Sequence, residues 1–281
     1  MDFSPQLYRH QREGRFDVVF ERHGSRTYIE RQYVSYPYHL TRPFELDPSI
    51  PSLVTLYQQS SSGGLYRGDR LISRLTARNG AAAHITTQAA TIVHDCHGSP
   101  ARQEMQVDVG EGCFLAYTPE PLILFPGAYA IAKTTVKLRD HAVVVLQDAF
   151  TWFDFKRRGE IFDQVESDVS VYDSNDTLVL RDRFCLSGRD LSGPASPVGR
   201  WRVVVNVFIL ADNDKLPSRE ELETTAAGLR SILGVTELPN NAGVGIRMLA
   251  DDAGAAQRSA ANIFCAAVAA MFGETPAPRR K

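Results

Sequence analysis

The chain has 281 residues, which allows one large domain or two ordinary ones, and we predict a single domain over residues 1–281. A formal net charge of −2, with 43% hydrophobic and 23% charged residues, argues against a nucleic-acid-binding polycation and a disordered acidic tail. The first residues lack the apolar core of a secretion signal, and no stretch reaches the ~18 uninterrupted apolar residues of a membrane span. We therefore expect a cytoplasmic globular protein without nucleic-acid or membrane partners.

The termini and the cysteines complete this general description. We expect roughly 13 residues at the amino terminus and roughly 8 at the carboxyl terminus to be frayed. The four cysteines, Cys96, Cys113, Cys185 and Cys265, lie far apart without a CxxC pair. In a cytoplasmic chain this pattern favours free, mostly buried thiols over disulfides or a zinc site.

The first predicted strands cover residues 16–24, 26–40 and 53–59. A turn at His23-Gly24-Ser25 joins the first two strands. Residues 41–51 contain three prolines, which fix φ and remove backbone donors, so this segment is expected to be an ordered loop.

Residues 60–93 are the most informative stretch of the sequence, because glycine turns alternate there with predicted strands. Gly63-Gly64 and Gly68-Asp69 bracket a short segment, and Asn79-Gly80 separates two runs that alternate apolar and polar residues. Asn-Gly is the strongest local signal of a β-hairpin, because both residues accept a positive φ. The sequence therefore predicts turn, strand, turn, strand, with small polar side chains over residues 82–93.

The middle of the chain continues the β pattern. Further strands are predicted on either side of the turn at residues 110–112 and, after Pro126-Gly127, over residues 129–138, 141–153, 165–173, 177–186 and 200–210. The run over 141–153 is rich in Val and Phe, which is typical of a strand covered on both faces. Ser174-Asn175-Asp176 has the composition of a hairpin turn.

Only the last quarter of the chain has helical patterns. Ser218 and Glu221 have the spacing of a capping box, which predicts a helix over 218–233. A second helix is predicted over 249–272, with one face composed mostly of alanine. The fold class is therefore mostly β: a large coiled (β-helix-like or sandwich-like) sheet core with two helices near the C-terminus, although no sequence repeat of fixed period is present.

The usual catalytic signatures, GxSxG, GxxxxGK[ST], HExxH and GxGxxG, are absent from the sequence. His94, Cys96 and His97 form the one cluster with metal-ligand character. On a strand, His94 and Cys96 would share a face. Two of the four ligands that a structural metal site usually has make a poor site. No metal site is therefore assigned. Four carboxylates remain, and each is either a turn cap or ion pair, or part of a polar path through the β core: Asp69, Glu120, Asp148 and Glu160.

Several segments together resemble a known family. They are SGGLYRGDRL, GAAAHITTQAATIV, YTPEPLILFPGA, the Gly159-Glu160 pair, RDRFCL and GVGIRMLADDA. From about Tyr36 to Gly273 the chain resembles the UreD family, also called UreH, of urease accessory proteins. The positions that match the family pattern are Gly63, Gly64, Gly68, Asp69, Thr86, Thr87, Gln88, Glu120, Gly159, Glu160 and Arg247.

This resemblance implies a non-enzymatic assembly protein with a coiled, helix-like sheet and a few helices. It implies binding to apo-urease, to UreF and, through UreF, to the GTPase UreG, in a complex that can dimerise. It also implies no tightly bound cofactor but nickel in transit through a polar tunnel, where buried residues such as Asp148 have a role.

The chain departs from the family pattern at several positions. Ile92 stands where a Lys is usual and Ala116 where a Glu is usual; the Gly-Arg pair before Gly159 is lost within Trp152 to Arg158, and a Trp is replaced near Phe264. Two other functions remain open. One is a hydrolase or lyase that uses paired carboxylates such as Asp69 and Glu160, and the other is a stand-alone nickel carrier that uses His94, Cys96 and His97.

Overall fold

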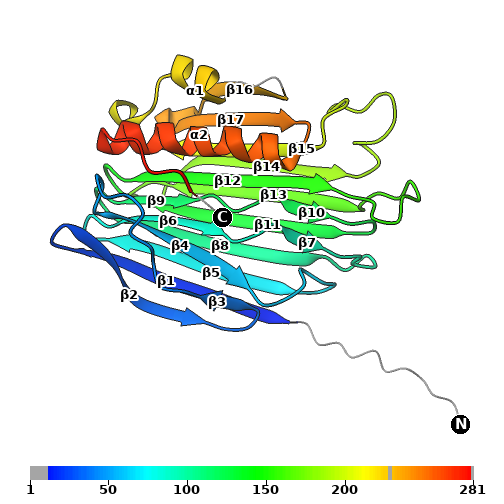
Figure 1. Ribbon diagram of the computed structural model, residues 1–281, viewed down its shortest axis with the longest axis horizontal. Helices are drawn as coiled ribbons and strands as arrows, with labels where there is room; N and C mark the ends of the chain where they lie inside the picture. Colours follow the sequence, from blue (N-terminus) through cyan, green and yellow to red (C-terminus); the bar gives the residue numbers. More distant parts are fainter. Residues whose placement is uncertain (1–11, 227–229, 280–281) are drawn as a thin grey trace, which may run out of the picture.

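Two large sheets form the body of the protein in the computed structural model, which describes residues 12–226 and 230–279 (Figure 1). One sheet has the spatial order β14 (Leu178–Ser187), β13 (Gln164–Tyr172), β11 (Tyr129–Leu138), β8 (Ala101–Val109), β5 (Arg70–Arg78), β1 (Glu13–His23) and β2 (Arg26–Val34). The other has the order β16 (Ser231–Glu237), β17 (Gly243–Ala250), β15 (Val203–Leu210), β12 (Val143–Trp152), β9 (Phe114–Tyr117), β6 (Ala82–Thr87), β4 (Leu53–Ser60) and β3 (Tyr38–Leu40). Two short strands, β7 (Thr91–Val93) and β10 (Leu122–Leu124), extend this second sheet beside β12.

Between β4 and β13 the chain winds as a coil, because consecutive long strands alternate between the two sheets. Within each sheet the neighbouring coils pair in parallel. Leu53, Ala82, Phe114 and Val143 are successive partners across β4, β6, β9 and β12. These partners are 29, 32 and 29 residues apart, so the turns of the coil have similar lengths although the sequence itself does not repeat. The predicted coiled sheet core is confirmed.

The prediction of a β-hairpin at Asn79-Gly80 is wrong, although the tight turn itself is present. Both residues have positive φ values, 53° and 71°, as a tight turn requires. The strands on either side do not pair with each other, since β5 pairs with β1 and β8 while β6 pairs with β4 and β9. The turn therefore passes the chain from one sheet to the other.

The single strand predicted over residues 82–93 is also corrected, because β6 ends at Thr87 and β7 begins at Thr91. Likewise, the strand predicted over 26–40 is divided into β2 and β3. Other predictions are confirmed. β1 and β2 pair antiparallel across the first turn, and β13 and β14 form an antiparallel hairpin around the Ser174-Asn175-Asp176 turn.

The helices are shorter than predicted. α1 (Arg219–Ala226) ends early, and residues from Ser231 belong to the edge strand β16; the prediction for 227–229 lies outside the described residues. α2 (Ala253–Phe272) begins after Leu249 and Ala250, which lie in β17. The Asp252 carboxylate caps α2 by accepting a hydrogen bond from the Ala255 N–H at 2.8 Å. Two 3₁₀ turns, Asn213–Lys215 and Pro239–Asn241, complete the helical segments described.

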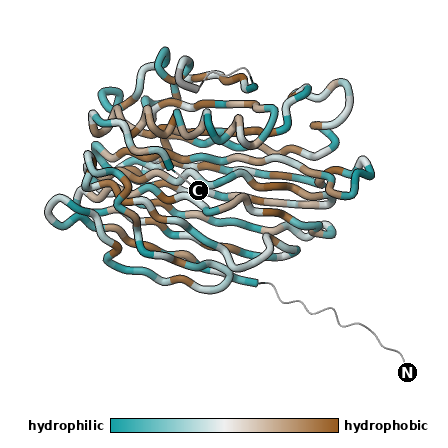
Figure 2. The backbone as a smooth tube through the Cα atoms, viewed as in Figure 1, coloured by the Kyte–Doolittle hydropathy of each residue, from teal (hydrophilic) through white to brown (hydrophobic). Residues whose placement is uncertain are grey.

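The apolar core is divided into three clusters. One lies between α2 and the outer face of the second sheet, and includes Val145, Ile246 and Ile263. The other two lie between the sheets, and hydropathy alternates along the strands that contribute to them (Figure 2). β12 borders both the helix and the interior, which confirms the prediction of a strand covered on both faces. In residues 12–226 and 230–279, no helix combines the length and apolar character required to cross a membrane.

Candidate functional site: a polar cavity inside the coiled sheet

A polar layer separates the two apolar clusters between the sheets. Toward one end of the strands, Leu75, Val107 and Leu115 belong to one cluster, and toward the other end Leu71, Phe150 and Val165 belong to the second. The positions between them are polar: on β4 and β5 they are Gln58 and Ser73, each 5% exposed. The pattern inside each strand thus changes from apolar to polar and back within a few residues.

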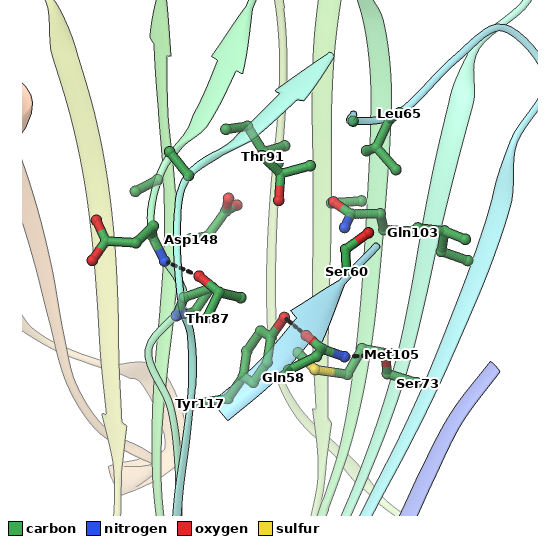
Figure 3. Close-up of a pocket in the computed structure, with 18 of the residues that line it drawn as sticks. Gln58, Ser60, Leu65, Ser73, Thr87, Thr91, Gln103, Met105, Tyr117 and Asp148 are labelled. Atoms are coloured by element: carbon green, nitrogen blue, oxygen red, sulfur yellow. Dashed lines mark hydrogen bonds between the residues drawn. The ribbon is translucent and has the colours of Figure 1, made fainter. Parts of the chain in front are cut away.

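A cavity of about 290 Å³ lies in this layer (Figure 3). Both sheets contribute to its wall, with Gln58, Thr87 and Asp148 from one and Ser73, Gln103 and Ser167 from the other. It also reaches the glycine turn, because Gly63 and Gly64 line it. The cavity therefore crosses several coils rather than lying within one.

A chain of hydrogen bonds spans the cavity from sheet to sheet. The Tyr117 hydroxyl donates to Gln58 Oε1 at 3.0 Å, and Gln58 Nε2 donates to Ser73 Oγ at 3.2 Å (Figure 3). Burial raises the pKa of Tyr117 well above its usual range, so the phenol keeps its proton and acts as a donor. This chain of neutral groups holds the two walls together.

Asp148 is a carboxylate in the cavity wall. Its Oδ2 atom is inaccessible to solvent and has no hydrogen-bond partner among the described residues. Burial raises the pKa of Asp148, and the smaller effects of Ser167 and Arg247 oppose this rise. An unpaired buried carboxylate oxygen is costly when it is charged, so the folded protein favours a proton on this group.

Asp148 belongs to a row that crosses three strands. It is the register partner of Asn206 on β15, and Asn206 is the partner of Arg247 on β17. The Arg247 guanidinium forms an ion pair with Asp182 of β14, on the other sheet. The predicted residue Arg247 therefore closes one end of the interior instead of lining the cavity.

Of the two roles left open for Asp69, the structure shows the ion pair in a turn. Asp69 is buried, at 3% exposure, but it does not line the cavity. Its carboxylate pairs with Arg12 and accepts a hydrogen bond from the Tyr66 N–H at 2.8 Å. Arg12 also donates to the Gly64 carbonyl oxygen at 2.9 Å, so Asp69 fixes the glycine turn to the start of β1.

Gly64 shows why that turn requires glycine. Its φ is 137°, and a Cβ atom there would lie 2.3 Å from the Ile92 carbonyl oxygen. The Leu65 N–H donates to the same oxygen at 2.8 Å, which joins the turn to β7. Gly68 also has a positive φ, 75°. Ile92, the departure from the family pattern, uses its backbone here and lines the cavity.

The Thr86-Thr87-Gln88 segment is only partly in the cavity wall. Thr87 and Gln88 line it, and Thr87 Oγ1 accepts a hydrogen bond from the Glu120 N–H at 2.9 Å. Thr86 is instead buried and donates to the Thr118 carbonyl oxygen at 2.7 Å. Glu120 also lines the cavity, and its Oε1 accepts a hydrogen bond from Gln257 of α2 at 2.8 Å.

Gly159 and Glu160 lie outside the cavity wall, in an exposed loop. Their N–H groups donate to Asp154 Oδ2 at 2.8 and 3.2 Å. Asp69 is buried against Arg12, whereas Glu160 is exposed in this loop, so the fold does not bring the two carboxylates to a shared site. The paired-carboxylate chemistry considered from the sequence therefore gains no support from these two residues.

His94, Cys96 and His97 do not converge. His94 stacks on Tyr66 with ring centroids 4.5 Å apart, Cys96 Sγ contacts the His94 and Tyr129 carbonyl oxygens, and His97 faces Asp95. The segment is not a regular strand, so the shared face expected for His94 and Cys96 is wrong. In the described part of the chain, no three His, Cys, Asp or Glu side chains gather as a metal-binding group.

Sequence reasoning missed several residues of the cavity wall. Gln58, Ser73, Gln103, Tyr117 and Ser167 are polar residues on the inward faces of their strands, and apolar residues lie further along the same faces. The change from apolar to polar residues is visible in the sequence. Because neutral polar residues in a strand are usually exposed, these positions can be assigned to the interior only when it is known which face of the strand points inward. Ala116 of the sequence departures lies elsewhere, in the cluster under α2.

Comparison with known proteins gives a consistent result. The family described as UreD urease accessory protein matches residues 12–281. The chain is 40% identical over 258 residues to urease accessory protein UreD 3 of Bradyrhizobium sp. (strain ORS 278), covering 92% of this chain and 91% of that protein. It is 38% identical over 281 residues to urease accessory protein UreD 1 of Bradyrhizobium sp. (strain BTAi1 / ATCC BAA-1182), covering 99% of both chains. A third relative, UreD 1 of Methylorubrum extorquens (strain PA1), is 37% identical over 94% of this chain and 90% of that protein.

Proposed function

Because the chain belongs to the UreD family of urease accessory proteins, we propose that it is a non-enzymatic scaffold for nickel insertion into urease. In this proposal it binds apo-urease and recruits UreF, and through UreF the GTPase UreG, in a complex that can dimerise. A cytoplasmic location is part of the proposal, and the four free thiols are consistent with a reducing compartment.

The observation that carries the proposal is the polar cavity with Asp148 in its wall. The cavity offers neutral oxygen groups and one carboxylate with an unpartnered oxygen. Such a set binds a divalent cation weakly, since Ni²⁺ is held firmly only by several nitrogen, oxygen or sulfur ligands in a suitable geometry. Weak binding suits a path along which nickel passes as cargo, and the proposed path runs through this cavity.

Asp148 has a specific role in this proposal. A proton on its carboxyl stabilises the buried group while the path is empty, and a passing cation would replace that proton. The Thr87, Ser73 and Gln58 groups would supply neutral oxygen contacts without adding charge. The polar layer would thus conduct the ion between the two apolar clusters.

The first test separates the path from the scaffold. Ala132 lines the cavity, and Ala132→Phe is expected to fill much of it without changing the outer surface. We expect this variant to bind UreF and apo-urease with unchanged affinity in pull-down assays, while the nickel content of co-expressed urease, measured by mass spectrometry, falls at least tenfold.

The second test uses Asp148→Asn with Asp168→Asn as its matched control. Asp168 also lies on a strand, but it faces outward and pairs with Arg181 at 2.7 Å. The Asp148 variant should yield nickel-poor urease and the Asp168 variant normal urease. Fully loaded urease from a strain that lacks this protein altogether would refute the maturation role.

A further inference from the structure

Six aromatic rings, four of them exposed and two partly buried, lie together outside the cavity and are here named the ring surface: Tyr36, Tyr66, His94, Phe125, Phe153 and Phe155. His94 stacks on Tyr66 and meets Phe125 edge-on with centroids 5.6 Å apart, and Phe125 contacts Phe155 at 4.8 Å. Tyr36 is 62% exposed, Phe153 58%, Phe155 50% and Tyr66 44%. Clustered exposed aromatic rings are typical of an interaction site, whereas single exposed rings are not.

Cations flank the ring surface. The Arg12 guanidinium lies 5.7 Å from the Tyr36 ring centroid and 5.6 Å from that of Tyr66, which joins these two rings. At the other end, Lys156 Nζ lies 5.3 Å from the Phe155 ring, and Arg157 and Arg158 follow it, both exposed. In residues 12–226 and 230–279, no ion pair is recorded for these last three residues.

Asp69 neutralises Arg12, whereas no described carboxylate forms an ion pair with Lys156, Arg157 or Arg158. Asp69 is buried against Arg12, and Asp154 is used inside its own loop. Asp154 Oδ1 accepts a hydrogen bond from the Lys156 N–H at 3.1 Å, and its Oδ2 accepts from Gly159 and Glu160. This loop geometry fixes the basic tip beside Phe153 and Phe155, so the surface is preorganised for a negatively charged partner.

We propose that the ring surface docks an acidic segment of a partner protein, with carboxylates at Lys156 to Arg158 and apolar atoms on Phe153 and Phe155. The surface lies next to the cavity, because His94 Nε2 contacts the Gly63 carbonyl oxygen at 3.1 Å and Gly63 lines the cavity. A partner bound here would therefore sit beside the polar path. The identity of the partner rests on the proposed function.

Two other occupants are disfavoured by chemistry. Single-stranded nucleic acid needs open ring faces for base stacking, but Tyr66 is already stacked on His94 and its ring also meets Arg12. Residues 1–11 of this chain contain one carboxylate, Asp2, and one arginine, Arg9, so they do not supply an acidic segment. Charge complementarity favours a separate acidic protein surface.

The test measures the affinity of purified apo-urease and of purified UreF, each alone, for the full chain by biolayer interferometry at low and high salt. A ring variant, Phe153→Ser/Phe155→Ser, and a charge variant, Lys156→Glu/Arg157→Glu/Arg158→Glu, are compared with Tyr28→Ser/Tyr33→Ser. That control removes two tyrosines of β2 that are 47% and 56% exposed and lie outside the ring surface.

We expect both test variants to bind one of the two partners at least tenfold more weakly than wild type does. The control should bind within twofold of wild type. The affinity of the wild-type chain should fall as the salt concentration rises. Because all the changed side chains are exposed, far-ultraviolet circular dichroism and the thermal unfolding midpoint should match wild type. If the ring variant misfolds, the charge variant alone decides.

Unchanged binding of both partners by both test variants would overturn the inference while leaving the proposed function intact. Loss of binding only to a dT₁₂ oligonucleotide probe would also overturn it, in favour of nucleic acid. If the wild-type chain bound neither protein, the proposed function and this inference would fail together.

Discussion

At the scale of single residues, Asp148 is partly buried and its Oδ2 atom is inaccessible and unpartnered, and this arrangement has a measurable consequence for stability. Its folded-state pKa is raised by burial above the unfolded value of about 3.9, so ionisation costs the folded state free energy as the pH rises. Below about pH 4 the group is protonated in both states and this cost is absent.

We therefore predict that Asp148→Asn increases the free energy of unfolding by about 1–3 kcal/mol at pH 7.5. The gain should shrink toward zero as the pH falls to about 4, because wild type then becomes neutral at this position too. Urea unfolding of both proteins at several pH values measures the difference. A gain independent of pH would show that Asp148 is not the titrating group.

Gly64 and Gly63 offer a second test at this scale, because they are adjacent but differ in geometry. Gly64→Ala places a Cβ against the Ile92 carbonyl oxygen at a positive φ, and should destabilise the protein by about 1–3 kcal/mol. At Gly63 the nearest atom to a new Cβ is the movable Tyr66 hydroxyl, at 3.0 Å, so Gly63→Ala should cost less than about 1 kcal/mol. Equal losses in thermal unfolding would contradict the turn geometry.

At the scale of elements, α2 is held on the second sheet by its own packing and by the chain that follows it (Figure 1). Arg279 forms an ion pair with Asp47 at 2.8 Å, with side-chain exposures of 10% and 0%, and its Nε contacts His84 Nδ1 at 3.3 Å. The Ala277 N–H also donates to Asp47 at 2.7 Å. The sequence predicted a frayed tail here, and the structure records these contacts as far as residue 279. His84 in turn stacks on Phe264 of α2, with centroids 4.1 Å apart.

Arg279→Ala should therefore destabilise the protein by about 3–5 kcal/mol, because it leaves the Asp47 carboxylate buried without its cation. Adding Asp47→Asn should restore part of that loss, since the remaining buried group is neutral. Chemical unfolding of the single and double variants measures both effects. Two losses that simply add would mean that these residues do not interact in solution.

At the scale of the whole molecule, the parallel coils lie in the middle of each sheet and antiparallel strands lie at the ends. β2 and β14 are the edges of one sheet, and β16 and β3 are edges of the other. The outer face of the first sheet carries charges that alternate in sign from strand to strand, as in the register row Glu104, Lys133, Asp168, Arg183. The outer face of the second sheet is covered by α2.

This arrangement predicts a gradient of local stability. Amide hydrogens of the central parallel strands β5, β6, β8 and β9 should exchange at least about tenfold more slowly than those of β2 and β16, whose outer edges are unpaired in the sheet order. Hydrogen–deuterium exchange with mass spectrometry resolves these segments. Uniform protection across both sheets would contradict the gradient.

The candidate site was only partly predictable from the sequence. Thr87, Gln88, Glu120 and Asp148 were named from the sequence and line the cavity. Asp69 and Arg247 were named as well, but each is held in an ion pair outside it. The sequence shows where a polar residue stands among apolar neighbours. It does not show which residue that polar side chain contacts, because the contacting residues lie on strands remote in sequence.

By itself, the sequence determined the β-rich class, most strand positions, the glycine turns and the small-residue helix near the carboxyl end, because these depend on local alternation and backbone preference. Only the tertiary structure decided which strands pair. Asn79-Gly80 forms its turn as expected, yet β5 and β6 separate because each gains a parallel partner from another coil. Parallel pairing joins residues far apart in the chain, and together with the packing of the two sheets it brings Gln58, Ser73 and Asp148 to one cavity.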